Sequence, residues 1–222
     1  PARRGARRRA RRDRGDLHAD DRLFFQPLVD VATSKQSGFE ALIRWQNAER
    51  GLVMPNEFIP LAEETGLIVP LGEWVIRTAM AEAARWSEPL TVAVNVSPVQ
   101  MRSPNLLPTI IHALADTGLD PARFEVEITE GVLLHDSEAN MAILHRMRDL
   151  GIKVALDDFG TGYSSLNYLR TFPFDKIKID RSFVNDLEQR EDCRAIVSAV
   201  IGLAPDDREA EQAEEVAAAL VA

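Results

Sequence analysis

Five short segments of this 222-residue chain alternate polar residues with branched apolar ones, a period of two that is typical of β-strands. Stretches long enough for a helix separate the five segments, which predicts parallel strands joined by crossovers and argues against hairpins. The segments are residues 38–44, 91–97, 124–129, 153–157 and 176–180. Their polar positions in one phase are Glu40, Asn95, Glu127, Asp157 and Lys178.

These polar positions lead to a specific expectation about the site. In a closed parallel barrel the apolar phase meets the surrounding helices and the polar phase points inward. Several carboxylates and a lysine would then converge on a small volume, where the carboxylates repel one another unless a cation joins them. The pattern therefore predicts an α/β barrel with a metal site inside it. The alternative, an antiparallel sheet with one face open to water, is disfavoured because the connections are too long for hairpins.

The flanking segments carry weaker signals. Residues 23–27 predict a short strand that stops at Pro27, because proline cannot donate to a strand ladder. Residues 51–55 predict a loop between the strand that contains Glu40 and the next helix.

Length and composition restrict the class of protein. A chain of 222 residues suits one large domain, somewhat short for a complete eight-stranded (β/α) barrel. Hydrophobic residues make up 45% and charged residues 27%, as in ordinary soluble proteins, and no run predicts a membrane span or a signal peptide. Cys193 is the single cysteine, which excludes an internal disulfide and agrees with a cytoplasmic location.

Charge divides the chain into three parts. Residues 1–14 hold eight arginines and one acid, whereas the rest of the chain holds 18 basic and 34 acidic side chains. We expect a disordered arginine-rich tail over residues 1–20, a barrel domain over 21–204 and an acidic, alanine-rich helix over 205–222. The tail could bind anionic lipid or nucleic acid, or reflect a misassigned start of the reading frame. The acidic body argues against nucleic acid as the main partner.

Several motifs in order resemble one known family. Glu40-Ala41-Leu42, followed by Ile43-Arg44-Trp45, resembles the name-giving motif of the EAL-domain cyclic di-GMP phosphodiesterases. The supporting motifs are Gln26-Pro27, Asn95-Val-Ser-Pro98, Glu127-Ile-Thr-Glu130, Asp157-Asp-Phe-Gly-Thr-Gly-Tyr-Ser-Ser165 and Lys176-Ile-Lys-Ile-Asp180. The resemblance covers roughly residues 23–203 and implies a TIM-like (β/α) barrel of the EAL type.

The resemblance also implies a role for each matched residue. Glu40, Asn95, Glu127 and Asp157 would ligate one divalent metal, and Asp158 would help to hold a second. All are oxygen donors, which suits a two-metal site of Mg²⁺ or Mn²⁺.

Outside the metal ligands, the family implies three further kinds of residue. Lys178 would orient the nucleophilic water, although a structural ion pair is an alternative. Glu130 would brace the loop beside the metals, although an ordinary surface acid is an alternative. Arg44 would grip a substrate phosphate with its planar guanidinium group, and Gln26 and Leu42 would line the same pocket.

At the level of the whole protein, the family implies hydrolysis of cyclic di-GMP to linear pGpG in bacterial signalling. It also implies a possible homodimer and possible sensory or GGDEF-type domains upstream. The pattern departs from the family after residue 204, where an Ala-Glu-Gly-Val-Glu-like seventh strand and a Gln-Gly-Tyr-like eighth strand are expected and do not occur. The barrel is therefore expected to be truncated after its sixth strand, with slowed hydrolysis and open sheet edges.

The departure leaves three hypotheses for the function. The first is a phosphodiesterase whose activity is impaired. The second is a catalytically inactive module that binds cyclic di-GMP or a protein partner. The third is a damaged gene product without a stable fold. Measured hydrolysis in the presence of Mg²⁺ or Mn²⁺ separates the first hypothesis from the other two.

Overall fold

The computed structural model describes residues 21–134, 137–160, 172, 174–180, 182–183, 190 and 194 of the chain. Its strands are β1 (Asp21–Asp30), β2 (Lys35–Asn47), β3 (Gly51–Val53), β4 (Thr91–Asn95), β5 (Phe124–Thr129), β6 (Lys153–Phe159) and β7 (Lys176–Ile179). Its helices are α2 (Pro55–Glu64), α3 (Ile68–Ala83), α4 (Pro98–Met101), α5 (Leu106–Thr117), the 3₁₀ turn η1 (Pro121–Arg123), α6 (Glu130–Leu134) and α7 (Ser137–Asp149).

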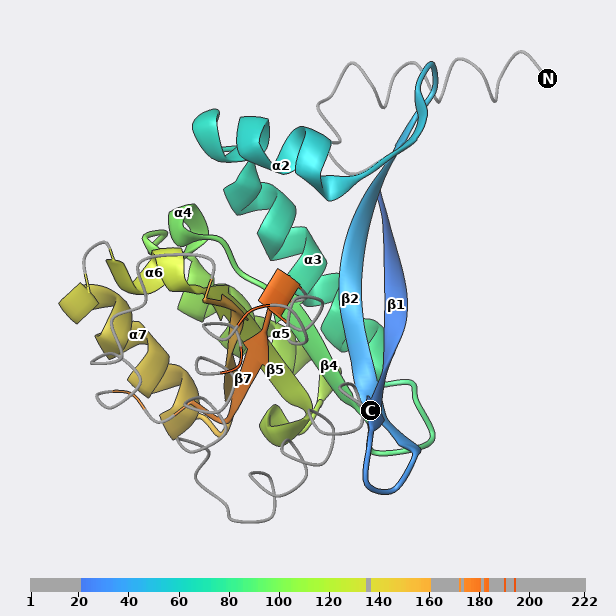
Figure 1. Cartoon of the computed structure of the whole chain (residues 1–222), viewed down its shortest axis with the longest axis vertical. Helices are drawn as coiled ribbons and strands as arrows, with labels where there is room; N and C mark the ends of the chain where they lie inside the picture. Colours follow the sequence, from blue (N-terminus) through green and yellow to red (C-terminus); the bar gives the residue numbers. More distant parts are fainter. Residues whose placement is uncertain are drawn as a thin grey trace.

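All seven strands belong to one sheet, shown in Figure 1 with its helices. The order is β1-β2-β4-β5-β6-β7, and β3 pairs with β2. Strands β2, β4, β5, β6 and β7 run parallel, with helical crossovers between β2 and β4, β4 and β5, and β5 and β6. The predicted α/β class with parallel strands is confirmed, and the described part is a curled portion of a barrel.

The hydrophobic core lies between the sheet and its helices. The apolar phase of the strands, including Val94, Val126, Val154 and Leu156, is buried in one cluster with residues of α3, α5 and α7. Helix α3 contributes Ile76, Ala79, Met80 and Ala83 to this cluster, all fully buried. Because side chains alternate along each strand, this packing turns the other phase toward the opposite, concave face of the sheet. Burial of the apolar strand residues against the helices therefore places the polar strand residues together on the concave face of the sheet.

Two sequence predictions about local structure are wrong. Strand β1 does not stop at Pro27 but continues to Asp30, with Pro27 opposite Phe39 of the antiparallel β2. Strand β1 stands at the end of the strand order, the edge position at which a sheet tolerates proline, and its pairing with β2 continues past Pro27. Residues 51–53 of the expected loop form β3, which pairs with the end of β2.

Other predictions fall on parts of the chain that are not described. The arginine-rich tail over residues 1–20 and the helix expected over residues 205–222 lie outside the described residues. Within the described residues, no helix is long and apolar enough to span a bilayer.

Candidate metal and substrate site

Three carboxylates and a lysine meet on the concave face of the sheet. One ligand atom from each of Glu40, Glu127 and Asp157 lies within 4.8 Å of the others. The Lys178 Nζ lies 2.8 Å from Oε2 of Glu127, 2.7 Å from Oδ2 of Asp157 and 3.6 Å from Oε2 of Glu40. These residues come from β2, β5, β6 and β7, so the cluster exists only when four strands are in register. The structure thus brings together the residues that the alternation predicted to converge.

Asn95 joins the same cluster at the end of β4. Its Cα pairs with that of Glu127 in the parallel ladder, and its Nδ2 donates a 2.7 Å hydrogen bond to Oε1 of Glu40. This bond holds Asn95 beside the acids and directs its Oδ1, the other atom of the amide, away from Glu40. All four residues assigned to the first metal are therefore neighbours.

Burial determines the electrostatics of the acids. The Glu127 side chain is fully buried. Burial, together with the negative charges of Glu40 and Asp157, raises its pKa to about 7 despite the opposing attraction of Lys178. Burial also opposes the charged form of Lys178, but the attraction of Glu127, Asp157 and Glu40 outweighs it and raises the lysine pKa. Burial and the charges of Asp157 and Asp180 raise the pKa of Asp158. Because three acids surround a single lysine, the cluster keeps an excess of negative charge, which favours binding of a further cation.

The donor set fits a divalent metal. Oε1 of Glu127 is buried and has no hydrogen-bond partner in the described part of the chain, so one acceptor of the most buried acid is unsatisfied. The ligands on offer are carboxylate and amide oxygens, the donors that hard cations such as Mg²⁺, Mn²⁺ and Ca²⁺ prefer. Glu40, Asn95, Glu127 and Asp157 could therefore hold one such ion.

Asp158 reaches the site through an irregular backbone. Consecutive residues of a regular strand point to opposite faces, so Asp157 and Asp158 should diverge. The β6–β7 register shifts between Leu156 and Phe159, and Asp158 has a φ of 53°, a left-handed conformation that aspartate tolerates. Asp158 consequently lines the same cavity as Glu127. A strand irregularity is thus what allows two adjacent aspartates to serve one site.

Glu130 connects α6 to the segment that follows Asp158. Its carboxyl group is buried, and its Oε1 accepts a 2.8 Å hydrogen bond from the backbone N–H of Gly160. Gly160 has a φ of 100°, and a Cβ there would lie 2.7 Å from the Phe183 ring, so glycine is required on two grounds. This geometry agrees with the bracing role expected for Glu130, which remains a prediction.

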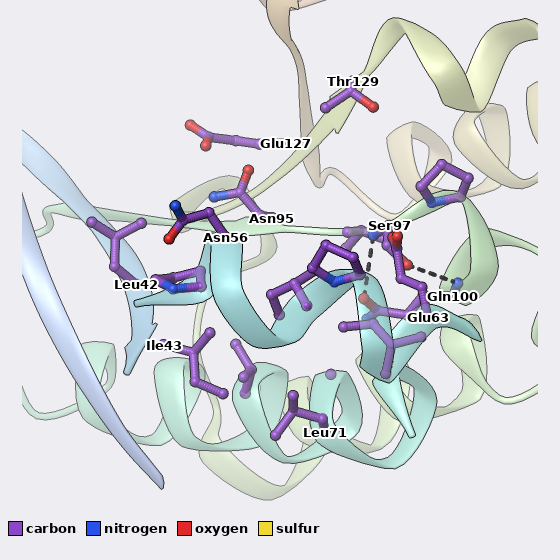
Figure 2. A pocket seen from close by; sticks show the side chains of 18 of the residues that line it. Leu42, Ile43, Asn56, Glu63, Leu71, Asn95, Ser97, Gln100, Glu127 and Thr129 are labelled. Atoms are coloured by element: carbon purple, nitrogen blue, oxygen red, sulfur yellow. Dashed lines mark hydrogen bonds between the residues drawn. The ribbon is translucent and has the colours of Figure 1, made fainter. Parts of the chain in front are cut away.

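A cavity of about 430 Å³ opens beside the acids. Figure 2 shows Asn95 and Glu127 at one side of it and Ile43 and Leu71 at another, so one end is polar and the other apolar. Helices α2 and α3 provide most of the apolar wall. The wall residues are Pro55, Ile59, Pro60, Ile68, Leu71 and Val75. A ligand with a charged group and a flat apolar part would suit such a space.

The antiparallel pairing of β1 with β2 determines which of the expected substrate-binding residues lie next to one another. Gln26 lies opposite Glu40, and residues directly opposite in such a pair share a face of the sheet. Leu42 lines the cavity, whereas Gln26 and Arg44 are not among its lining residues. The Arg44 guanidinium donates from Nη1 to the carbonyl of Ile43 at 2.8 Å.

The same register adds two candidates that the sequence interpretation missed. Phe24 lies opposite Leu42 and Arg22 lies opposite Arg44, and 47% of Phe24 is exposed. Both residues share the strand phase of Gln26 at intervals of two, and this spacing was the available signal. Aromatic and cationic side chains on this face add surfaces for a base and a phosphate.

A second ion pair lies in the same phase of β5 and β7, one step before the site. Nζ of Lys176 contacts both carboxylate oxygens of Glu125, at 2.7 and 3.0 Å, and Glu125 is 2% exposed. This pair is separate from the three acids around Lys178. It provides a matched reference for experiments on the site.

Comparison with known proteins places the chain in a family. The model of the EAL domain matches residues 8–207. A signalling protein of Caulobacter vibrioides is 50% identical over 89% of the chain, and the cyclic di-GMP phosphodiesterase PA2567 of Pseudomonas aeruginosa is 43% identical over 82% of it. The chain spans 25% and 32% of those two proteins, about a quarter to a third of their length.

A solved structure gives the same answer for the fold. The phosphodiesterase PaMucR in complex with cyclic di-GMP superimposes with a TM-score of 0.80 and 34% identity, over 91% of this chain and 88% of the other. The protein therefore belongs to the EAL domain family, and its strands and helices form part of a TIM-type barrel of that family.

Proposed function

We propose that this EAL domain is a metal-dependent phosphodiesterase that hydrolyses cyclic di-GMP to linear pGpG. The observation that carries the proposal is the convergence of Glu40, Glu127 and Asp157 around Lys178, with ligand atoms within 4.8 Å of one another. Family membership and the phosphodiesterases among its relatives support it.

The metal would be held by this chain's oxygen donors. Glu40, Asn95, Glu127 and Asp157 would bind one Mg²⁺ or Mn²⁺, and Asp158 would help to hold a second. The unsatisfied Oε1 of Glu127 supports the first assignment, and the placement of Asp158 beside the cavity supports the second. When bound, such ions activate water and stabilise the charge that develops on phosphate oxygens.

The protein residues would position the substrate and the water. Lys178, with two short contacts to Glu127 and Asp157, would hold a water at the acids by donating a hydrogen bond to it. Arg44 would bind a phosphate of the substrate, and Leu42 with the apolar cavity wall would bind a base. Gln26 would contribute a polar contact beside Glu40, which it opposes in the ladder. Glu130 would keep the segment after Asp158 in place through Gly160.

The decisive experiment uses two matched variants of the full chain. Glu127→Gln removes the charge of the buried site acid, and Glu125→Gln makes the same change two residues earlier, in the same strand phase. We expect Mn²⁺-dependent formation of pGpG, followed by chromatography, to be lost in Glu127→Gln and kept in Glu125→Gln. Binding without hydrolysis in the unmodified chain would instead identify a non-hydrolytic cyclic di-GMP module. Equal activity of both variants would overturn the site assignment.

The setting of the domain is also a proposal. Because the match covers only 25% and 32% of the length of those two relatives, we propose that the domain works beside sensory or GGDEF-type domains in a cytoplasmic signalling protein. A homodimer is an expectation of the family resemblance. Sedimentation of the chain with and without cyclic di-GMP would test it.

A further inference from the structure

We infer that Gln100, locked between Ser97 and Gly72, is a positioning residue that holds Asn95 at the site. The consequence for metal binding and turnover rests on the proposed function, whereas the structural link itself does not. The sequence interpretation gave no role to Gln100 or Gly72, and it included Ser97 only as part of the Asn95–Pro98 motif.

The first step is a reciprocal pair of hydrogen bonds at the start of α4. The Ser97 N–H donates to Oε1 of Gln100 at 3.2 Å, and the Gln100 N–H donates to Oγ of Ser97 at 3.3 Å (Figure 2). This is a capping box, in which side chains satisfy backbone donors that the helix leaves unpaired. Gln100 is only 4% exposed, so a lost partner could not be replaced freely by water.

The second step connects this box to the metal site. Asn95 is the last residue of β4 and lies two residues before Ser97. Between them, the Val96 N–H donates to the carbonyl of Glu127 at 2.8 Å. The backbone is therefore fixed at residues 96 and 97, directly after the side chain that bonds Glu40. A released turn at Ser97 would allow the end of β4 to move and Asn95 to leave its place.

The third step explains the glycine in α3. A Cβ at Gly72 would lie 1.8 Å from Nε2 and 2.6 Å from Cδ of Gln100, so the helix backbone packs directly on this side-chain amide. Glycine inside a helix is normally less stable than alanine, which means that its presence here has a packing reason. An alanine methyl group would force Gln100 into another rotamer, and the capping box would then be lost.

If the position of Asn95 depends on the capping box, and the capping box on the contact between Gly72 and Gln100, variants of these two residues should affect the site in related ways. Gly72→Ala and Gln100→Ala should have the same effect on the site, because one displaces the amide and the other deletes it. The double variant should be no worse than Gln100→Ala, since removal of the long side chain leaves room for the new methyl group. Gln100→Glu keeps a carboxyl acceptor for the Ser97 N–H and should rescue the box.

The matched control is Gly131→Ala, on the neighbouring helix α6. A Cβ there meets Thr129 Oγ1 at 3.6 Å and Pro98 Cγ at 3.8 Å, which are ordinary van der Waals contacts. It tests the same substitution near the same loop without displacing a buried amide.

Two measurements test the inference on the full chain. Hydrogen–deuterium exchange of peptides that cover residues 92–101 should rise in Gly72→Ala and Gln100→Ala, but not in Gly131→Ala or Gln100→Glu. Mn²⁺ affinity should fall by roughly 10- to 100-fold in the first two variants, the scale of lost groups that orient metal ligands. Unchanged exchange and affinity in Gly72→Ala, or additive losses in the double variant, would overturn the inference. If the unmodified chain binds no Mn²⁺, the proposed function fails, and the exchange data still decide the role of Gln100.

Discussion

Replacement of Lys178 by methionine should destabilise the metal-free protein and make its stability strongly dependent on metal. Lys178 Nζ contacts Glu127 at 2.8 Å and Asp157 at 2.7 Å, and its side chain is 25% exposed. Removal of one partner of a buried charge pair costs about 3–5 kcal/mol. The lysine is partly exposed, and Glu127 can take up a proton once Lys178 no longer lowers its pKa. We therefore expect the lower end, about 3 kcal/mol, at pH 8.

A divalent cation should recover much of that loss. In the parent chain, Mn²⁺ at 100 times its Kd stabilises the folded state by about 2.7 kcal/mol. Without Lys178, one oxygen each of Glu127 and Asp157 is released for the cation. A tenfold gain in affinity would add about 1.4 kcal/mol. The deficit of Lys178→Met should therefore shrink from about 3 to about 1.5 kcal/mol at the same free Mn²⁺ concentration.

Lys176→Met is the matched control for this experiment. It makes the same substitution two residues earlier on β7, and it also removes the lysine ammonium group that pairs with a buried acid, Glu125. Urea unfolding of both variants, followed by tryptophan fluorescence with EDTA or with a Mn²⁺ series, gives the free energies of unfolding. The Lys176→Met deficit should not depend on Mn²⁺. An equal, metal-independent deficit in both variants would refute the idea that Lys178 and the cation share oxygens.

Three further predictions concern the substrate and pH. Arg44→Ala should weaken cyclic di-GMP binding by about 1.5–3 kcal/mol in calorimetry, whereas Lys178→Ala should lower hydrolysis and leave binding nearly intact; equal losses of binding would contradict the roles. Phe24→Ala should cost about 1 kcal/mol of binding if a base stacks there, and Leu52→Ala, equally exposed at 47% on β3, should cost nothing. With EDTA, the free energy of unfolding should fall by up to about 3 kcal/mol as the pH rises from 4.5 to 7, because over this range the folded state retains the Glu127 proton that the unfolded state loses. Urea titrations of Glu127→Gln should not show this pH dependence.

The convergence of four polar residues on one face of the sheet could be predicted because its signal is local. In each strand the polar residues alternate with strongly apolar ones, and the polar residues concerned are Glu40, Asn95, Glu127 and Asp157. Because Val94, Val126 and Val154 are buried against the helices, the polar side chains must point to the other face of the sheet. The alternation of polar and apolar residues therefore predicts the face of the sheet on which each side chain lies. Parallel crossovers, read from the spacing of the strands, then bring these residues to one place.

Pairing partners and irregularities could not be predicted in the same way. Nothing in residues 21–30 shows that β1 pairs with β2 antiparallel, and this register alone sets Phe24 beside Leu42. Asp158 would belong to the wrong face in a regular strand, and only the bulge and its positive φ turn it toward the cavity. Gln100 and Gly72 are ordinary helix residues in sequence, and their close approach depends on the packing of α3 against α4.

The two interpretations of Lys178, a structural ion pair and a residue that orients water, are compatible under the proposed function. The lysine satisfies oxygens of Glu127 and Asp157 in the metal-free protein, and its raised pKa keeps it charged throughout the physiological range. The cluster of three acids is thereby folded before any cation arrives, with Oε1 of Glu127 still unsatisfied. With a cation held by these acids, Lys178 would no longer be needed to neutralise them, and its ammonium group could donate hydrogen bonds to a water beside the same oxygens. Under the proposed function, a side chain that stabilises the fold without metal would already be in position for hydrolysis with metal, and metal affinity would be lower than the acids alone would give.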